Sequence, residues 1–153
     1  MTHSGDMTED RAPHTDPFTP ADAQRHRAER TYTALFRIEE RHAATPDARS
    51  RQGATQTITP QEAVRLVTML AAGSIPVDED EPAVDRADLI AALTLVPLVR
   101  AEIDALELSL IQVARGRGMA WSEIAFGLGL RSAQAAQQRS DRLARRSDED
   151  SAT

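Results

Sequence analysis

Hydrophobic side chains recur every three or four residues along most of the chain beyond residue 20. This spacing places them on one side of a helix, because an α-helix completes a turn in 3.6 residues. No segment alternates hydrophobic and polar residues over a length that would favour a strand. The pattern therefore predicts an all-α fold, in which N-terminal helices are followed by a C-terminal group of three helices.

The first helix is expected at residues 20–42. Thr19 is a suitable N-cap, Pro20 suits the first helical position, and Asp22 follows the cap by three residues. An apolar stripe on this helix needs a partner helix to cover it. The stripe predicted from the spacing consists of Ala28, Tyr32, Leu35, Phe36 and Glu39.

A second helix start follows residues 45–57, which are predicted to be a linker because they are rich in proline, glycine, serine and threonine. Thr59 is the expected N-cap, with Pro60 behind it and Glu62 three residues on. Gly73 is expected to end this helix. The residues predicted to be buried are Ala63, Leu66, Val67, Leu70 and Ala71.

Asp85 is expected to cap a third helix. Because proline lacks the backbone N–H that a helix interior uses, this segment either kinks at Pro97, which we favour, or restarts with Pro97 in its first turn. A new helix is expected where Asp104 and Glu107 form a D-x-x-E capping pair. We therefore predict a domain boundary between residues 98 and 99. The predicted inner faces are Leu89, Ile90, Leu93 and Val96 for the earlier helix, and Leu106, Leu110, Ile111 and Ala114 for the later one.

Turns that contain glycine are expected to separate the last three helices. Gly116 and Gly118 are expected to end the first of them, and Ser122 to cap a short second helix. Ser132 is expected to cap the third helix, which should run to Arg146. That helix is predicted to turn Ala136, Ser140 and Leu143 inward, and Gln134, Gln137, Gln138, Asp141, Arg142 and Arg145 outward.

Ala125 and Gly129 have the spacing typical of a helix-turn-helix. Two helices that cross closely need a small residue at the contact, and the turn four residues later needs one that tolerates a positive φ. Residues 99–146 are therefore predicted to form a tri-helical helix-turn-helix domain. The expected core contacts around the turn are Trp121, Ile124, Leu128 and Leu130.

The outward side of the last helix has side chains suited to a major groove. Glutamine amides can donate and accept at adenine edges, and arginines can meet phosphates or guanine. The same residues also suit a solvated helix face, and the C-terminal arginines suit a charge run that complements the helix dipole. The candidate DNA-binding residues are Arg131, Ser132, Gln134, Gln137, Gln138, Arg139, Arg142, Arg145 and Arg146.

The charge distribution along the chain is consistent with a DNA contact in the C-terminal part of the chain. The formal net charge of the chain is −6, but residues 111–146 hold seven arginines against two acidic residues. Residues 1–110 hold 11 arginines against 19 acidic residues, and residues 147–153 hold three acidic residues and no arginine. Because the basic charge is concentrated where the helix-turn-helix is predicted, the acidic total does not exclude a nucleic acid as a partner.

Several classes of site have no support in the sequence. The chain has no cysteine, which excludes disulfides and thiolate metal sites, and its four histidines are scattered. No glycine-rich phosphate loop or nucleophile elbow is present, so we expect no enzyme, no metal and no cofactor. The N-terminus lacks a basic start followed by an apolar run, and no stretch is long enough to span a membrane, so we expect a soluble cytoplasmic protein. Residues 1–19 and 147–153 have no apolar period and are predicted to be disordered tails.

One segment, "RAEIDALELSLIQVARGRGMAWSEIAFGLGLRSAQAAQQRSDRLARR", resembles the C-terminal helix-turn-helix of a group of actinobacterial regulators. This group includes regulators of a small heat-shock protein. The group's pattern is roughly L-D-x-x-E-x-x-L-I-x-x-A-R-x-x-G-x-S-W-x-E-I-A-x-x-L-G-x-x-S-R-Q-A-A-x-x-R. The resemblance covers residues 99–146, about a third of the chain, and implies sequence-specific DNA binding in transcription control.

Three residues depart from that pattern. Ala133 stands where the group has arginine, Ser140 where an aromatic residue is usual, and Asp141 brings an acid to the face expected to meet DNA. Replacing a groove-facing arginine by alanine forfeits about 1–3 kcal/mol of base discrimination or phosphate contact. Asp141 repels a nearby phosphate unless Arg145, one turn on, neutralises it. These departures bear on the affinity for DNA rather than on the fold.

The sequence therefore predicts a transcriptional regulator that binds double-stranded DNA, forms a homodimer and is associated with the nucleoid. In this interpretation residues 99–146 read DNA, and residues 20–98 pair the subunits or sense a signal. The alternative is a protein-interaction module or adaptor with a degenerate helix-turn-helix that does not read DNA. In that case the acidic N-terminal half would bind a basic protein partner.

Overall fold

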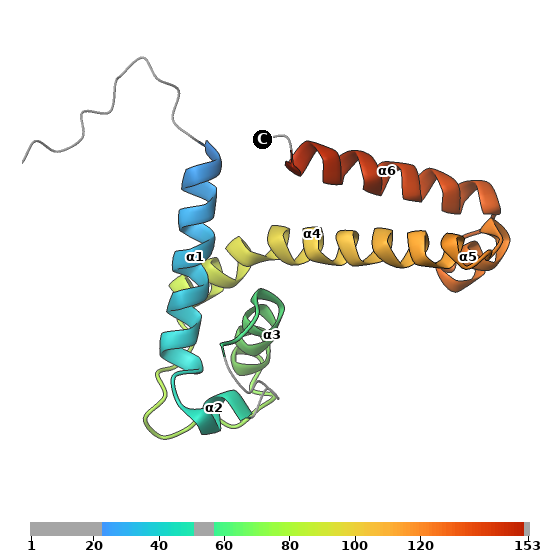
Figure 1. The fold of residues 1–153 in the computed structure, drawn as a ribbon. Coiled ribbons are helices and arrows are strands. Elements are labelled where there is room, and N and C mark those ends of the chain that lie inside the picture. Colours follow the sequence, from blue (N-terminus) through green and yellow to red (C-terminus); the bar gives the residue numbers. More distant parts are fainter. Residues whose placement is uncertain (1–22, 51–56, 152–153) are drawn as a thin grey trace, which may run out of the picture.

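The computed structural model describes residues 23–50 and 57–151, and in this part of the chain it contains only helices. Figure 1 shows one long helix with a bundle of helices at its N-terminal end and two further helices at its C-terminal end. The expected tail at residues 1–19 and the expected helix start at Thr19 lie outside the described residues. The helices are α1 (Ala23–His42), α2 (Pro46–Ser50), α3 (Pro60–Ala71), α4 (Arg86–Gly116), α5 (Trp121–Gly127) and α6 (Ala133–Ser151).

The N-terminal bundle consists of α1, α3 and the first half of α4 around one hydrophobic core. Burying a large aliphatic side chain contributes about 1.5–3 kcal/mol, so this core is the main source of the bundle's stability. Its largest fully buried hydrophobic side chains are Ile38, Ile58, Leu66, Val67 and Leu95.

The face of α1 that packs into this core differs from the predicted one. Tyr32 and Phe36 were expected inside, but they are 73% and 54% exposed, whereas Ala34 and Ile38 are buried. The apolar residues of α1 occupy more than one side of the helix, so spacing alone does not select a face. In the observed arrangement Arg37, Arg41 and His42 of α1 make polar contacts with α4.

A buried carboxylate, Asp88 of α4, lies at the centre of these polar contacts. Its side chain is fully inaccessible to solvent. Arg37 donates from Nε to Asp88 Oδ1 at 2.9 Å, and Arg41 Nε lies 3.0 Å from the same oxygen. The His42 ring lies between two carboxylates, with Nε2 3.3 Å from Asp88 Oδ2 and Nδ1 3.0 Å from Glu81 Oε1.

The same carboxylate completes the N-terminal cap of α4. Asp88 accepts a hydrogen bond from the Asp85 backbone N–H at 3.0 Å, and the Asp85 side chain accepts from the Asp88 N–H at 2.9 Å. This reciprocal pair confirms that α4 begins after Asp85. Burial by itself raises the pKa of the Asp88 carboxyl, but hydrogen bonds from the Asp85 backbone and from His42 and Arg41 lower it to about 2.

Helix α3 follows its prediction closely. The Thr59 hydroxyl accepts from the Glu62 N–H at 3.2 Å, and the Glu62 carboxylate accepts from the Thr59 N–H at 2.7 Å. Gly73 ends the segment with φ +67°, as expected for a left-handed residue behind a helix. Ala63, Leu66, Val67 and Leu70 are buried as predicted, whereas Ala71 is exposed. The predicted linker contains the short helix α2 before it passes into residues 51–56, which lie outside the described residues.

Helix α4 corrects the expectation that a new helix begins at Asp104. It is one continuous helix of 31 residues, with Pro97 inside it, so no new helix begins at Asp104 and Glu107. A D-x-x-E pair also fits a helix interior, where residues three apart share a face, and here both acidic side chains contact α6. The residues on either side of position 98 therefore belong to one helix, which is about 46 Å long.

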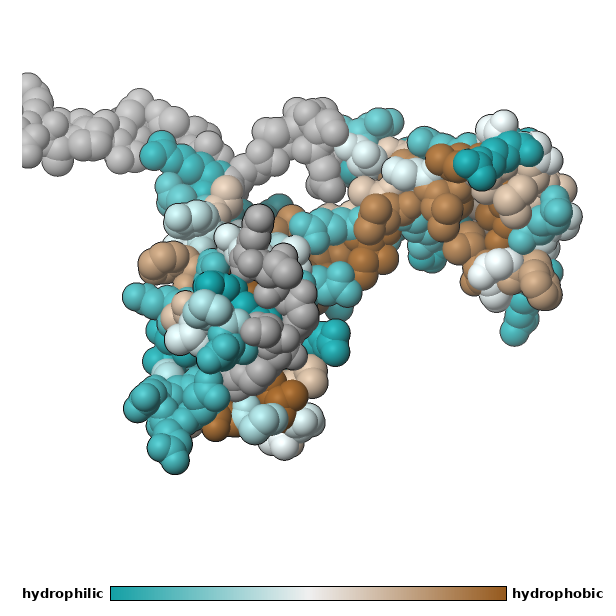
Figure 2. Space-filling model, turned by 60° about the horizontal axis from the view of Figure 1, so that its bottom comes forward, coloured by the Kyte–Doolittle hydropathy of each residue, from teal (hydrophilic) through white to brown (hydrophobic). Residues whose placement is uncertain are grey.

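The C-terminal half of α4 packs against α5 and α6 around a second core. Leu106 and Leu110 were expected in it, but they are 70% and 67% exposed, and Ile111 is the buried member of the predicted face. Figure 2 shows hydrophobic side chains at the surface along the arm of the molecule that α4 forms. The buried residues of this core are Ile111, Ile124, Ala125, Ala136 and Leu143.

Within residues 23–50 and 57–151, no helix combines the length and the apolar composition that crossing a bilayer requires.

Candidate nucleic-acid interface

The short helix α5 begins two residues earlier than predicted. Its N-cap is Ala120, whose backbone N–H donates to Glu123 Oε2 at 2.7 Å. Ser122, the predicted cap, lies inside the helix and is exposed. A carboxylate three residues behind the cap is one half of a capping box, and here it stabilises the helix start without a serine hydroxyl at the cap position.

The turn between α5 and α6 has the predicted glycine geometry. Gly129 has φ +66°, its N–H donates to Phe126 O at 3.1 Å, and the Leu130 N–H donates to Ala125 O at 2.8 Å. These two bonds form a Schellman motif, which satisfies carbonyl groups at the helix end and reverses the chain. Ala125 is buried at 3% exposure, so the small residue and the turn residue occupy their expected positions.

Two glycines near this turn provide a matched test of the geometry. We expect Gly129→Ala to destabilise the protein by about 1 kcal/mol, because an alanine at positive φ is strained even though open space surrounds the added Cβ. Gly127→Ala, inside α5 with similar space, should leave stability unchanged or raise it by up to about 1 kcal/mol. Thermal unfolding followed by circular dichroism measures both, and equal effects of the two substitutions would contradict the assigned turn.

Helix α6 begins as predicted. Ser132 Oγ accepts from the Ala135 backbone N–H at 3.1 Å, which is the hydrogen bond of an N-cap. Ala136 and Leu143 are 0% and 2% exposed, so the predicted inner face is confirmed, with Ser140 half-buried beside it. The helix continues through Ser151, past the predicted end at Arg146 and into the acidic segment that was expected to be disordered.

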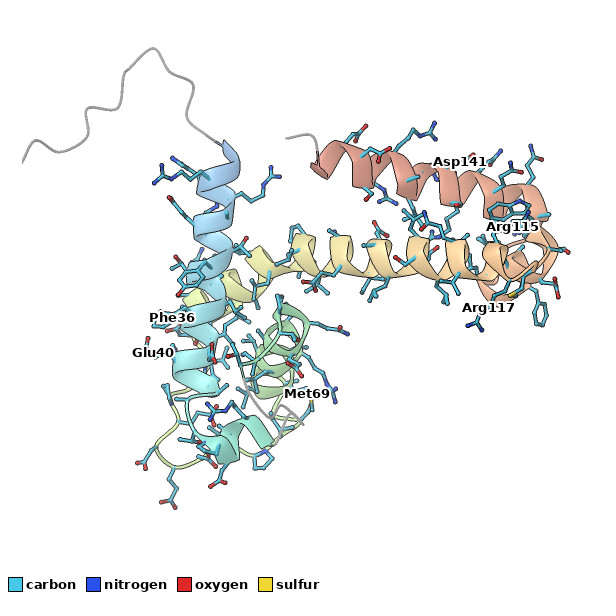
Figure 3. All side chains as sticks on the ribbon, viewed as in Figure 1. Phe36, Glu40, Met69, Arg115, Arg117 and Asp141 are labelled. Atoms are coloured by element: carbon cyan, nitrogen blue, oxygen red, sulfur yellow. The ribbon has the colours of Figure 1, made fainter. Side chains whose placement is uncertain are left out.

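The outer side of α6 is polar and open to solvent. Its exposed residues project within about 140° of one another around the helix axis, if each residue turns by about 100°. Asp141, labelled in Figure 3, lies among them. Arg131 and Ser132 are also exposed at the helix start. The exposed residues of this outer face, which we call the α6 outer face, are Gln134, Gln137, Gln138, Asp141, Arg142 and Arg145.

Two of the candidate arginines contact α4 instead of projecting from this face. Arg139 forms a two-pronged ion pair with Glu107, in which Nη2 donates to Oε2 at 2.6 Å. Arg146 Nη1 lies 2.9 Å from Asp104 Oδ2. The hydrogen bond from the Arg139 guanidinium holds the pKa of the Glu107 carboxyl below its ordinary value. These pairs position α6 along α4.

The sequence contained a signal for these pairs that the prediction did not use. Arg139 and Arg146 are seven residues apart and lie closer to the buried side of α6 than to its outer face. Asp104 and Glu107 lie one turn apart on α4. The pairing of Arg139 with Glu107 and of Arg146 with Asp104 requires both acids to lie inside a continuous α4. The sequence pattern predicts a capping role for these acids, and that role leaves no side chain free for α6.

Arg115, near the C-terminal end of α4, contacts residues of the turn into α5. The Arg115 guanidinium lies 5.0 Å from the centre of the Trp121 ring, within the range of a cation–π contact, and its Nη1 donates to Met119 O at 2.5 Å. Arg115 and Arg117 are both exposed in this region, at the end of α4 nearest α5 (Figure 3). The prediction included neither residue among the candidate contacts.

No family model, curated protein or solved structure matches this chain. Among the described residues, no group of three or more histidine, aspartate or glutamate side chains is placed to hold a metal ion. The case for a function therefore depends on the geometry and charge of the α5–turn–α6 unit.

Proposed function

We propose that the protein is a sequence-specific DNA-binding transcriptional regulator that uses α5, the Gly129 turn and α6 as a helix-turn-helix. In this proposal α6 lies in the major groove, and its outer face contacts base edges and phosphates. The observation that carries the proposal is the α6 outer face itself, where three exposed glutamines and two exposed arginines project from a helix whose other side is buried.

Local charge supports this orientation. Residues 111–146 carry seven of the arginines of the chain but only two acidic residues. Arg131, Arg142 and Arg145 are exposed at the start of α6 and on its outer face, where they would approach phosphates. Asp141 reduces this potential, but Arg145 follows it by four residues, the spacing at which opposite charges on a helix offset each other. We leave Arg139 and Arg146 out of the proposed contacts because both are engaged with α4.

A homodimer associated with the nucleoid is part of this proposal. Regulators with a helix-turn-helix commonly bind two half-sites, with recognition helices about 34 Å apart on one side of the duplex. The same two-fold symmetry would then appear in the operator.

The alternative function is a protein-interaction module with a degenerate helix-turn-helix. Asp141 on the outer face and Ala133 at the start of α6 favour it, because an acid repels phosphate and an alanine cannot donate to it. The acidic N-terminal half would then bind a basic protein.

A salt titration of DNA binding separates the two functions. Duplexes are first selected from a random library with the purified protein, and affinity is then measured by fluorescence anisotropy at several salt concentrations. A regulator should enrich one sequence and show a log–log slope of about −3 per protomer, as expected for three displaced counterions. If no sequence is enriched, the DNA-binding proposal is wrong and the interaction module is the better explanation.

A further inference from the structure

Helix α4 carries a row of hydrophobic side chains that joins neither core. Ile103 is 50% exposed, Leu106 70%, Leu110 67% and Val113 52%, while Val96 and Val99 at the start of the row are half-buried. Successive members are three and four residues apart in turn, which is the a and d spacing of a coiled coil. The row, which we call the α4 seam, consists of Val96, Val99, Ile103, Leu106, Leu110 and Val113.

The α4 seam is distinct from the surface on which α6 packs. Helix α6 contacts α4 through Asp104, Glu107 and the buried Ile111. At about 100° per residue, the centre of the seam lies roughly 100° around α4 from that contact surface. Figure 2 shows the hydrophobic band along α4 with no other element over it in this view.

We propose that the α4 seam is the homodimer interface and that it packs against the seam of a second copy in the antiparallel direction. Val96 of one copy then lies opposite Val113 of the other, and Ile103 opposite Leu106. A row with a and d spacing is self-complementary, because the same helix presents both the knobs and the holes.

The charges beside the seam select the direction. In the antiparallel arrangement Glu102 of one copy faces the neutral Ser109 of the other, and Arg100 lies beside the Glu107–Arg139 ion pair of the other copy. In a parallel arrangement Glu102 would face Glu107 of the second copy, and two like charges across a seam oppose pairing. Arg100 and Glu102 are both exposed, whereas the Glu107 side chain is only 14% exposed and is paired with Arg139 of its own chain.

The antiparallel dimer also gives the two α6 helices a spacing that suits two half-sites on DNA. This part of the inference rests on the proposed function. The symmetry axis passes between Ile103 and Leu106, and the C-terminal end of α4, where α6 begins, lies about 17 Å from it along α4. The starts of the two α6 helices are then about 34 Å apart in that direction, close to one turn of DNA. Because α6 lies to the side of the seam, this axis keeps both α6 helices on the same face, whereas a parallel pairing would place them on opposite faces.

Sedimentation of the full chain without DNA tests the interface. We expect a monomer–dimer equilibrium that Leu106→Glu and, separately, Leu110→Glu each weaken by about tenfold or more, with helix content unchanged because both side chains are exposed. Tyr32→Glu on α1, where the side chain is 73% exposed, adds the same charge to a similarly exposed apolar position and should leave the equilibrium unchanged. A chain that is monomeric at all concentrations, or a dimer that Tyr32→Glu weakens and the two seam variants do not, overturns the proposal.

Because the chain has no cysteine, introduced cysteines can report the direction of pairing. The double variant Val96→Cys/Val113→Cys should form a covalent dimer on mild oxidation, since the two positions face each other across an antiparallel seam. The single variant Val113→Cys should not, because the two copies of that residue lie about 26 Å apart. Efficient cross-linking of the single variant would overturn the antiparallel direction.

Failure of this inference is distinguishable from failure of the proposed function. A monomeric Leu106→Glu protein should still bind a single half-site, because the α6 outer face is intact. Loss of the dimer is measured without DNA, and half-site binding is measured on the monomer by anisotropy.

Discussion

Changing Arg142 and Arg145 together to glutamate should weaken binding to the selected DNA site by about two orders of magnitude or more. Both arginines are exposed on the α6 outer face and neither lies in the core, so the fold should be retained. The change replaces two phosphate-neutralising groups by two groups that phosphate repels. It should also make the log–log salt slope shallower by about two, since roughly one counterion per lost contact is no longer displaced.

A control variant separates contact from net charge. Arg30→Glu/Arg65→Glu produces the same change in net charge from exposed residues of α1 and α3. Fluorescence anisotropy on one selected duplex should show only a small loss for this control. If the α6 variant retains the affinity of the original protein, the DNA-binding proposal is wrong. If both double variants lose affinity equally, binding reflects overall charge and not a site on α6.

The second large effect concerns the buried carboxylate of the N-terminal bundle. We expect Asp88→Ala to lower the free energy of unfolding by about 3–5 kcal/mol, the cost of removing one partner from a buried ionic network. Arg37, Arg41 and His42 would lose their shared acceptor, and the N-terminal cap of α4 would lose half of its capping box. Chemical denaturation followed by circular dichroism measures the difference, with Asp80→Ala, an exposed acid in the preceding loop, as a control that should change stability by less than about 0.5 kcal/mol.

The pH dependence of unfolding gives an independent test of the same network. The Asp88 pKa is lowered to about 2 in the folded protein, so the ionised form is stabilised by folding. Its contribution, about 2 kcal/mol, is fully present above the ordinary aspartate pKa near 4 and is lost as the pH falls towards 2. Asp88→Asn should remove this part of the acid-side decline, and a variant that declines as steeply as the original protein would show that Asp88 is not its source.

The sequence by itself determined the local features of the fold. The capping box at Thr59 and Glu62, the cap at Ser132 and the left-handed turns at Gly73 and Gly129 all lie where they were predicted. Each depends on hydrogen bonds between residues no more than five positions apart, so neighbouring residues are sufficient to predict it. The inner side of α6 was predictable for a related reason, because only one side of that helix is apolar.

Only the tertiary structure decided which faces of α1 and α4 are buried and that α4 is one continuous helix. Helix α1 has apolar residues on two sides, and the observed docking brings Arg37 and Arg41 to Asp88, about 50 residues away along the chain. A second long-range ion pair makes Arg139, a candidate DNA contact in the sequence, a partner of Glu107. The packing of whole helices also leaves the residues of the α4 seam outside both cores. Such contacts join residues far apart in sequence, whose geometry depends on how whole helices pack, so helical spacing in one segment cannot specify them.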